Sequence, residues 1–208
     1  MEANTCKASA AVKYTEIAAR YELQLNSLLQ ILSESEARLI KTPADAFFDA
    51  HINFLVKAYL ISLCCYLEAF LKDLADERVA RIQRRLALAK VPHNVILWSV
   101  GGQKEKEFKF SNFELAIDRE SIDEQISGNP YKTIKAFKLL GIDMQSDPSF
   151  NQLKDLVGTI VDKRNKIIHY NDSASDISLG DLKNHVASFA SYGKAIALHT
   201  GSMCPDGA

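Results

Sequence analysis

Strand signals are nearly absent from this sequence of 208 residues, and apolar positions recur at helical spacing instead. The chain also lacks internal repeats and low-complexity tracts. Apolar residues make up 47% and charged residues 25%, the proportions of an ordinary globular protein. We therefore predict an all-α fold, a four-helix bundle around one sizeable core.

The familiar motifs of cofactor and metal binding are missing. No G-x-x-x-x-G-K loop, G-x-G-x-x-G turn or G-x-S-x-G elbow occurs. The five histidines show neither an H-E-x-x-H pattern nor a paired spacing with cysteine. We therefore expect no cofactor and no metal site.

An excess of positive charge is also missing, because the formal net charge is -1. Proteins that bind nucleic acid through bulk charge are strongly basic, so that class is excluded. Any contact with RNA has to be local, or has to use a surface that assembly creates.

Cysteine is scarce and shows no C-x-x-C pair; the four residues are Cys6, Cys64, Cys65 and Cys204. The N-terminus shows no secretory leader, so we expect a cytoplasmic protein. The most apolar segment, residues 52–71, is interrupted by Lys57 and Glu68. We expect this segment to be a core helix without membrane association.

Helix signals divide the chain into four main helices and an insertion. The predicted main helices cover about residues 8–40, 43–89, 148–169 and 178–199. We interpret residues 1–200 as a single domain and residues 201–208 as a loose tail. An insertion of short helices, about residues 92–147, separates the second and third main helices.

The second predicted helix begins with Thr42 as its N-cap and Pro43 in its first turn. It is apolar nearly all round between Phe47 and Leu74, which predicts the most buried helix of the fold. Its end, residues 77–85, is charged. The basic cluster there is predicted to be a solvated face; it consists of Arg81, Arg84 and Arg85.

Three local signals organise the insertion. Trp98 and Gly101-Gly102 are expected in a loop with a short extended piece. A capping box at Ser111 predicts the start of a short helix. Asn129-Pro130 predicts the start of another, which Gly141 ends.

The third main helix is predicted to carry an arginine on its apolar face. Spacings of three and four place five side chains on that face: Leu153, Val157, Ile160, Arg164 and Ile168. An arginine there has to be paired or has to line a cleft. Asn165 and His169, four residues apart, share a neighbouring face, and His169 falls at the helix end, where a titrating group can reach solvent.

Arginine and histidine at such a place suit phosphodiester transfer. Histidine takes or gives a proton near neutral pH, and arginine stays charged and holds a phosphate by two contacts. In RNA the 2′-OH beside the scissile phosphate is the nucleophile. Neither a protein nucleophile nor a metal ion is then needed.

Arg164-Asn165, followed by His169 after four intervening positions, resembles the motif of the HEPN superfamily, the higher eukaryote and prokaryote nucleotide-binding domains. That motif is an arginine, a polar residue and a histidine near the end of the third main helix. Residues 66–74 and 129–142 are similar to the RiboL-PSP-HEPN-like branch. The resemblance covers most of residues 45–199.

The resemblance implies a four-helix domain and a symmetric homodimer that brings two Arg164/His169 pairs to one cleft. It implies a metal-independent endoribonuclease with RNA as substrate, often a toxin or phage-defence effector with a cognate antitoxin or defence partner. His169 would be the acid and base, Arg164 the phosphate clamp and Asn165 the positioning residue. Some family toxins carry a tyrosine two positions after the histidine, which an antitoxin modifies; here Tyr170 follows His169 directly, so this modification is not carried over.

Several residues keep two interpretations. Glu68 either orients Arg164 across a helix interface or reaches solvent or Lys72. Asn165 either positions substrate or is an ordinary polar residue at a helix end. The remaining candidates are either RNA contacts or ordinary packed and solvated side chains; they are Tyr170, Lys163 and Lys166. For the whole chain, the alternatives to an RNase are a catalytically silent interaction module and a nucleotide-binding module.

Overall fold

The computed structural model describes residues 2–101 and 108–202, with side chains from residue 13 onward. Its helices are α1 (Glu2–Ile40), α2 (Ala46–Ala89), α3 (His93–Ser99), α4 (Arg119–Gln125), α5 (Pro130–Leu139), the 3-10 turn η2 (Met144–Ser146), α6 (Pro148–Tyr170) and α7 (Leu179–Ser202). Within the described ranges no β-strand occurs, and extended pairing is limited to one isolated bridge between Pro92 and Asn112. The all-α prediction is confirmed.

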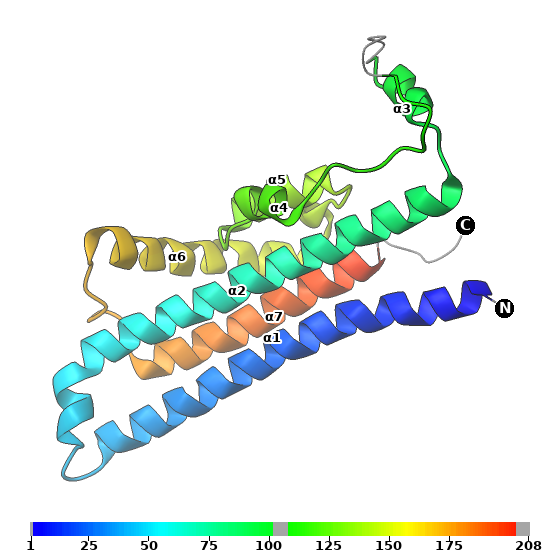
Figure 1. Cartoon of the computed structure of the whole chain (residues 1–208). Helices are drawn as coiled ribbons and strands as arrows, with labels where there is room; N and C mark the ends of the chain where they lie inside the picture. The colour runs from blue at the N-terminus through cyan, green and yellow to red at the C-terminus, as the bar shows by residue number, and fades with distance from the viewer. Residues whose placement is uncertain (1, 102–107, 203–208) are drawn as a thin grey trace.

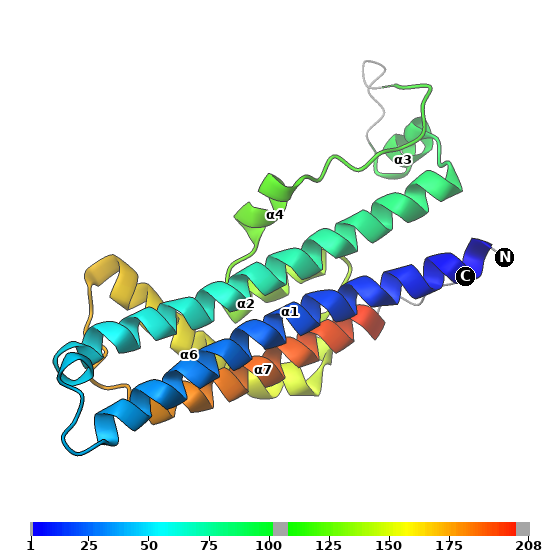
Figure 2. The ribbon, with the colours of Figure 1, turned by 60° about the horizontal axis from the view of Figure 1, so that its bottom comes forward.

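Four long helices build the bundle. α1, α2 and α7 run side by side along the long axis of the molecule, and α6 packs against α2 and α7 (Figure 1, Figure 2). Buried apolar side chains from all four helices meet in one core, among them Leu32, Leu67, Phe150 and Phe189. The number and order of the main helices match the prediction, although α1 already begins at Glu2.

The start of α2 differs from the prediction. Asp45, in an extended conformation, is the N-cap, and its carboxylate accepts a hydrogen bond from the backbone N–H of Phe47 (3.0 Å). Thr42 and Pro43 lie in the bend before the helix. Aspartate is the stronger N-cap of the two residue types, so the later signal prevails.

α6 and α7 start within one residue of the predicted third and fourth main helices. Asp147 accepts a hydrogen bond from the backbone N–H of Phe150 (2.7 Å). At α7 the backbone N–H of Asp181 donates to Ser178 Oγ (3.0 Å), and the Asp181 carboxylate accepts from the Ser178 backbone N–H (2.9 Å). This is a reciprocal capping box. α7 continues to Ser202, so Gly201 and Ser202, predicted to belong to a loose tail, are helical; residues 203–208 lie outside the described part.

Residues 92–147 contain short helices, but not all at the predicted places. α3 includes Trp98, for which a loop was expected, and Gly101 follows it in a turn, while Gly102 lies outside the described residues. No helix follows Ser111; α4 starts later, where Asp118 accepts from the backbone N–H of Ser121 (2.9 Å). Short helices depend on tertiary packing, so a capping box alone does not create one. α5 begins at Asn129-Pro130 as predicted.

The second half of the insertion belongs to the core. α4 packs on α2, and α5 packs on α6. Their apolar side chains are buried there, including Ile122, Ile126 and Phe137. α3, in contrast, stands off the end of α2, away from the bundle (Figure 1, Figure 2).

The prediction that α2 is the most buried helix of the fold is wrong for its first half. Phe47 is 60% exposed and Phe54 is 70% exposed. By length and composition α2 passes the test for a membrane-spanning helix, as core helices of soluble proteins also do, yet only 39% of its most apolar window is buried. One apolar face of α2 is therefore left uncovered by the described residues.

The charged end of α2 is also different from the prediction. Glu77 and Arg81 are buried, with 7% and 5% exposed. The two side chains form an ion pair across one turn of α2, and α1 packs over this part of the helix. Arg84 and Arg85 are exposed, as expected for a solvated face.

Candidate active site

The C-terminal end of α6 is tied to α2. Asn171 ends α6 in the left-handed conformation, with φ of 50°. The Lys57 ammonium donates to the Asn171 backbone carbonyl (3.3 Å) and side-chain oxygen (3.0 Å). The next loop is held as well, because the Ala174 backbone N–H donates to Asn53 Oδ1 (3.0 Å). The sequence analysis missed this clamp, although Lys57 interrupting an apolar segment was its signal.

Arg164 lies at the interface of α6 and α2, with its side chain 15% exposed. One terminal nitrogen donates to Glu68 Oε2 (3.2 Å), and the other donates to the side-chain oxygen of Asn165 (3.1 Å). The Nε–H is buried and finds no hydrogen-bond acceptor among the described residues. The guanidinium is thus fixed by a carboxylate on one side and by an amide oxygen on the other.

Cys64 lies beside this guanidinium on α2. Burial raises the pKa of its thiol to about 12, although the charge of Arg164 acts in the opposite direction. The thiol therefore stays protonated and adds no negative charge to the site.

Glu68 contacts both Arg164 and Lys72, which the sequence analysis gave as alternative partners. Oε2 accepts from Arg164, and Oε1 pairs with the Lys72 ammonium (3.2 Å). Lys72 in turn approaches Asp123 of α4 (3.7 Å). A chain of alternating charges therefore links the arginine of α6 to the insertion, and Lys72 is a supporting residue that sequence analysis had considered only as an alternative partner.

His169 lies in the last turn of α6, and its side chain is exposed. Tyr170 is 81% exposed, with its ring centroid 6.4 Å from that of His169. No hydrogen bond or ion pair of His169 is found within residues 13–101 and 108–202. Five residues separate Arg164 from His169, which turns their side chains about 140° apart around the helix. One chain alone therefore does not face the two groups toward one another.

The two candidate lysines differ. Lys163 forms ion pairs with Asp172 (3.1 Å) and Asp176 (2.9 Å) of the following loop. Its hydrogen bonds lower the pKa of both carboxyls, and they raise the pKa of the lysine. Lys166 is exposed, and no ion pair of it is found in the described part of the chain. Lys166 is therefore the better placed of the two for an external phosphate.

The apolar face of α6 ends differently from the prediction. Val157 and Ile160 are buried as expected, but Ile168 is 49% exposed and Ile167 takes the buried position. Two successive steps of four residues rotate the face by about 80° in all, so a step of three after Arg164 returns to the core.

An apolar surface leads along α2 to this site. Phe47, Phe54, Ile61 and Glu68 follow one another at intervals of seven residues, which keeps them close to one line along the helix. Phe47 and Phe54 are exposed, Ile61 is half-buried, and Cys65 beside them is exposed. We call Phe47, Phe54, Ile61 and Cys65 the outer stripe; it ends at the carboxylate that holds Arg164.

No group of three or more His, Cys, Asp or Glu side chains that could hold a metal ion occurs among the described residues. The site consists instead of one fixed arginine, one amide, one solvent-facing histidine and the neighbouring apolar stripe. Such a set can bind an anion and exchange protons.

Comparison with known families identifies the chain. The sequence profile of the RiboL-PSP-HEPN family matches residues 20–200 of the 208. The chain therefore belongs to this family of HEPN domains, which associates it with nuclease or RNA-related function. Comparisons with curated proteins and with solved structures found no match.

Proposed function

We propose that this protein is a metal-independent endoribonuclease that works as a homodimer. The observation that carries the proposal is the arginine at the end of the outer stripe. Arg164 is held by Glu68 and Asn165, and its Nε–H has no acceptor among the described residues. A fixed cation whose side chain is still 15% exposed suits a phosphate group, whose oxygens gain charge during transfer.

His169 supplies the proton transfers. In the proposed reaction it takes the proton of the 2′-OH while the 2′-oxygen attacks the adjacent phosphorus. The bond from phosphorus to the 5′-oxygen then breaks, and the leaving oxygen receives the proton that His169 has taken. The products are a 2′,3′-cyclic phosphate and a free 5′-OH. Arg164 stabilises the charge on the phosphate, and Asn165 and Glu68 keep the guanidinium in place.

Two observations support a dimer. Within one chain Arg164 and His169 turn to different sides of α6, so a complete site needs a second surface. The outer stripe supplies a place for it, because a contiguous apolar face of this kind usually marks an interface. A second copy on the outer stripe would bring two Arg164 residues and two His169 residues to one cleft.

A role as a toxin or phage-defence effector in the cytoplasm fits this activity and the family. A cognate antitoxin or defence partner would then restrain it. The second candidate function is a catalytically silent interaction module. The observation that favours it is that Arg164 already has two protein partners, as a purely structural arginine would.

The test of the activity is RNA cleavage by purified protein in EDTA. The wild-type protein is compared with Arg164→Ala and His169→Ala, and circular dichroism verifies that each remains helical. We expect the wild type to leave 2′,3′-cyclic phosphate ends, and each variant to lose roughly a hundredfold or more in rate. Cleavage that survives His169→Ala would overturn the mechanism.

The dimer has its own matched pair of variants on α2. Phe54→Glu places a charge in the outer stripe, whereas Leu88→Glu changes a residue that is similarly exposed, 77% against 70%, near the other end of the helix. We expect Phe54→Glu to elute as a monomer in size-exclusion chromatography and to be inactive in the cleavage assay. Leu88→Glu should remain an active dimer. A dimeric, active Phe54→Glu protein would exclude the outer stripe as the interface.

A further inference from the structure

α3 and the segment that returns from it project from the end of α2, away from the bundle (Figure 1, Figure 2). We call residues 90–101 and 108–113 the arm. No residue of α3 is buried. The arm therefore adds little to the core, and its surface is open to a partner.

Hydrogen bonds hold the two sides of the arm together. The backbone N–H of His93 donates to the carbonyl of Ser111 (3.0 Å). The backbone N–H of Lys109 donates to the side-chain oxygen of Asn94 in α3 (2.9 Å), which fixes Lys109 beside this helix. The side chains of the arm are therefore positioned before a partner arrives, and this lowers the entropy cost of binding.

The arm exposes several large apolar side chains. Trp98 is 71% exposed, Phe110 is fully exposed, and Phe108 is about half exposed. Val95, one turn before Trp98 on α3, is exposed as well, and so is Val100. Single exposed apolar residues are ordinary on a protein surface, but a group of them in one place marks a binding surface.

Positive charge gathers in the same part of the chain. Residues 84–101 and 108–113 contain four lysines and arginines and no aspartate or glutamate. Residues 102–107 contribute two lysines and two glutamates, whose charges cancel. The formal net charge of residues 84–113 is therefore +4, and that of the rest of the chain is -5. This contrast favours an anionic partner for the arm.

Two of the four cations belong to the arm itself. Lys90 and Lys109 are exposed, and no ion pair of either is found among the described residues. Lys109 also has an aromatic residue on each side in the sequence. Arg84, in contrast, is held by Glu77 (2.7 Å). The charge that the arm offers to a partner therefore comes from its two lysines.

Exposed rings beside lysines suit a single-stranded nucleic acid. Bases stack on aromatic faces, and the cations contact the phosphates of the strand. A duplex keeps its bases stacked on one another, so it does not offer their faces to Trp98 or Phe110. A protein partner could also cover the rings, but lysines without neighbouring carboxylates favour a polyanion.

We propose that the arm binds single-stranded RNA. Bases stack on the rings of Trp98 and Phe110, and the two lysines of the arm hold the phosphates. The choice of RNA rests on the proposed endoribonuclease function. Glu68 precedes Lys90 by 22 residues, about 33 Å along α2. A stacked strand of about ten nucleotides covers this length at ~3.4 Å per nucleotide, so the arm holds a long substrate outside the cleavage site.

The experiment uses the fluorescence of Trp98, which is the only tryptophan of the sequence and therefore reports on the arm alone. The probe is a 20-nucleotide 2′-O-methyl RNA, which lacks the nucleophile of the proposed cleavage reaction. We expect this strand to quench the emission saturably and without a blue shift, because a base stacks on the indole. The same strand annealed to its complement should bind at least about tenfold more weakly. A failure to quench, or equal binding of strand and duplex, would overturn the proposal.

An aromatic variant tests the stacking. Phe110→Ala keeps the fluorescent reporter and should weaken binding about fivefold or more, the loss of one stacked base. The matched control is Tyr131→Ala on α5, which removes a ring that is 56% exposed and whose hydroxyl donates to Asp155 (2.9 Å). This control should bind as the wild type does. Equal binding by the two variants would contradict stacking on the arm.

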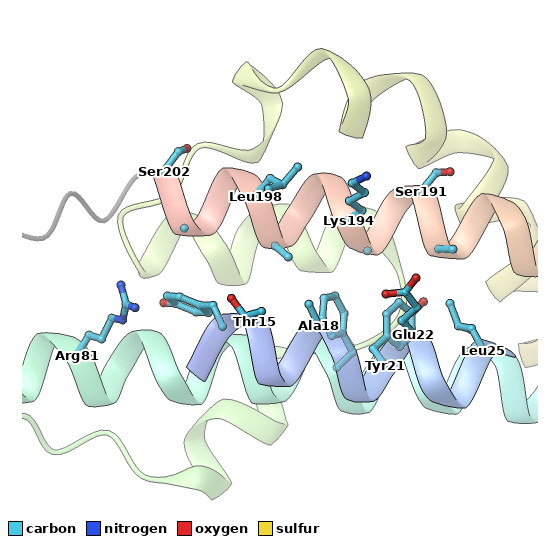
Figure 3. A pocket seen from close by; sticks show the side chains of 16 residues that line it. Thr15, Ala18, Tyr21, Glu22, Leu25, Arg81, Ser191, Lys194, Leu198 and Ser202 are labelled. Carbon is cyan, nitrogen blue, oxygen red and sulfur yellow. The ribbon is translucent and has the colours of Figure 1, made fainter. Parts of the chain in front are cut away.

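A double lysine variant tests the phosphate contacts. Lys90→Gln/Lys109→Gln should reduce the slope of log Kd against log salt concentration by about 1.4, the value for two phosphates on a single strand. The control is Lys41→Gln/Lys194→Gln, which removes two exposed lysines outside the arm. Lys41 precedes the other end of α2, and Lys194 lines a groove between α1 and α7 (Figure 3). An equal change of slope in both double variants would refute a local contact at the arm.

Three outcomes separate this inference from the RNase proposal and from other partners. Cleavage of RNA by the wild type, without quenching by the 2′-O-methyl strand, would refute the arm alone. Quenching without cleavage would refute the RNase and support the arm as an RNA-binding element. A blue shift with phosphatidylserine vesicles, without quenching by the strand, would assign the arm to a lipid surface and overturn the proposal.

Discussion

Two glutamates on opposite sides of α2 each bind an arginine. Glu68 and Glu77 are nine residues apart, which places them about 180° apart around the helix. Glu68 binds Arg164 of α6, a partner 96 residues away in the chain. Glu77 binds Arg81, one turn further along the same helix. The chemistry is the same, but the surroundings differ.

The difference shows that packing decides what such a pair can do. Glu77 and Arg81 side chains are 7% and 6% exposed, because α1 and the ring of Tyr14 close that side of α2. Glu68 and Arg164 are 29% and 15% exposed, beside the uncovered outer stripe. The first pair mainly serves the interior of the chain, and the second remains within reach of a ligand or of another copy.

The largest effect on stability is expected from Glu77→Ala. It removes the carboxylate from three cations, one of them the buried Arg81. Loss of one partner of a buried pair costs about 3 kcal/mol, whereas Glu77→Gln should cost less because the amide still accepts hydrogen bonds. Urea denaturation followed by circular dichroism gives both values. A cost no larger than that of Glu68→Ala would end the distinction between the two sides of α2.

Gly193→Ala tests how tightly the same side is packed. The added methyl group would lie 2.5 Å from the Tyr21 ring and 3.3 Å from the Phe70 ring that stacks on it. We expect a loss of about 2 kcal/mol from overpacking. Gly201→Ala is the matched control, because position 201 lies in the same helix, yet has no atom within 4 Å of the added Cβ. Equal melting temperatures of the two variants would show that Tyr21 moves away at little cost.

The two sides of α2 also show which features of the fold can be predicted from the sequence and which cannot. The predicted ranges of α6 and α7 are correct, because local hydrogen bonds at Asp147 and Ser178 set their starts. The apolar composition of α2 does not distinguish a face covered by α1 and α7 from a face that is left exposed. The exposure of Phe54 therefore required the tertiary arrangement.

The candidate site also has residues that the sequence predicts and contacts that it does not. Arg164 is found from its place on the apolar face, and Glu68 from its place among apolar neighbours. The Lys57–Asn171 clamp and the link from Lys72 to Asp123 join elements far apart in sequence, and spacing carries no information about such contacts. The burial of Arg81 was missed for the same reason, since α1 covers it only in the folded bundle.

Glu68→Ala tests the more exposed of the two pairs, Glu68 with Arg164. We expect a stability loss of only about 1 kcal/mol, because water reaches the pair and Asn165 still accepts from Arg164. RNA cleavage should fall about tenfold, since the guanidinium loses its main anchor. Glu68→Gln, which keeps an acceptor, should recover part of the rate at equal stability. A stability loss without any change in cleavage would reduce Glu68 to a structural residue.

The smallest effect concerns the loop after α6, and it depends on pH. The hydrogen bonds of Lys163 lower the pKa of Asp172 and of Asp176 in the folded state. A carboxyl whose pKa is lowered by folding adds stability above its unfolded pKa, near ~3.9, and this contribution is lost as the pH falls through the folded value. The melting temperature of Lys163→Gln should therefore lie below that of the wild type at neutral pH, and the two should converge as the pH falls from about 4 through the lowered folded pKa values. Lys166→Gln, three residues further along α6, changes an exposed lysine for which no ion pair is found in the described part of the chain, and it should show no such convergence. A Lys163→Gln difference that is independent of pH would mean that the lysine stabilises the loop through its packing and not through its charge.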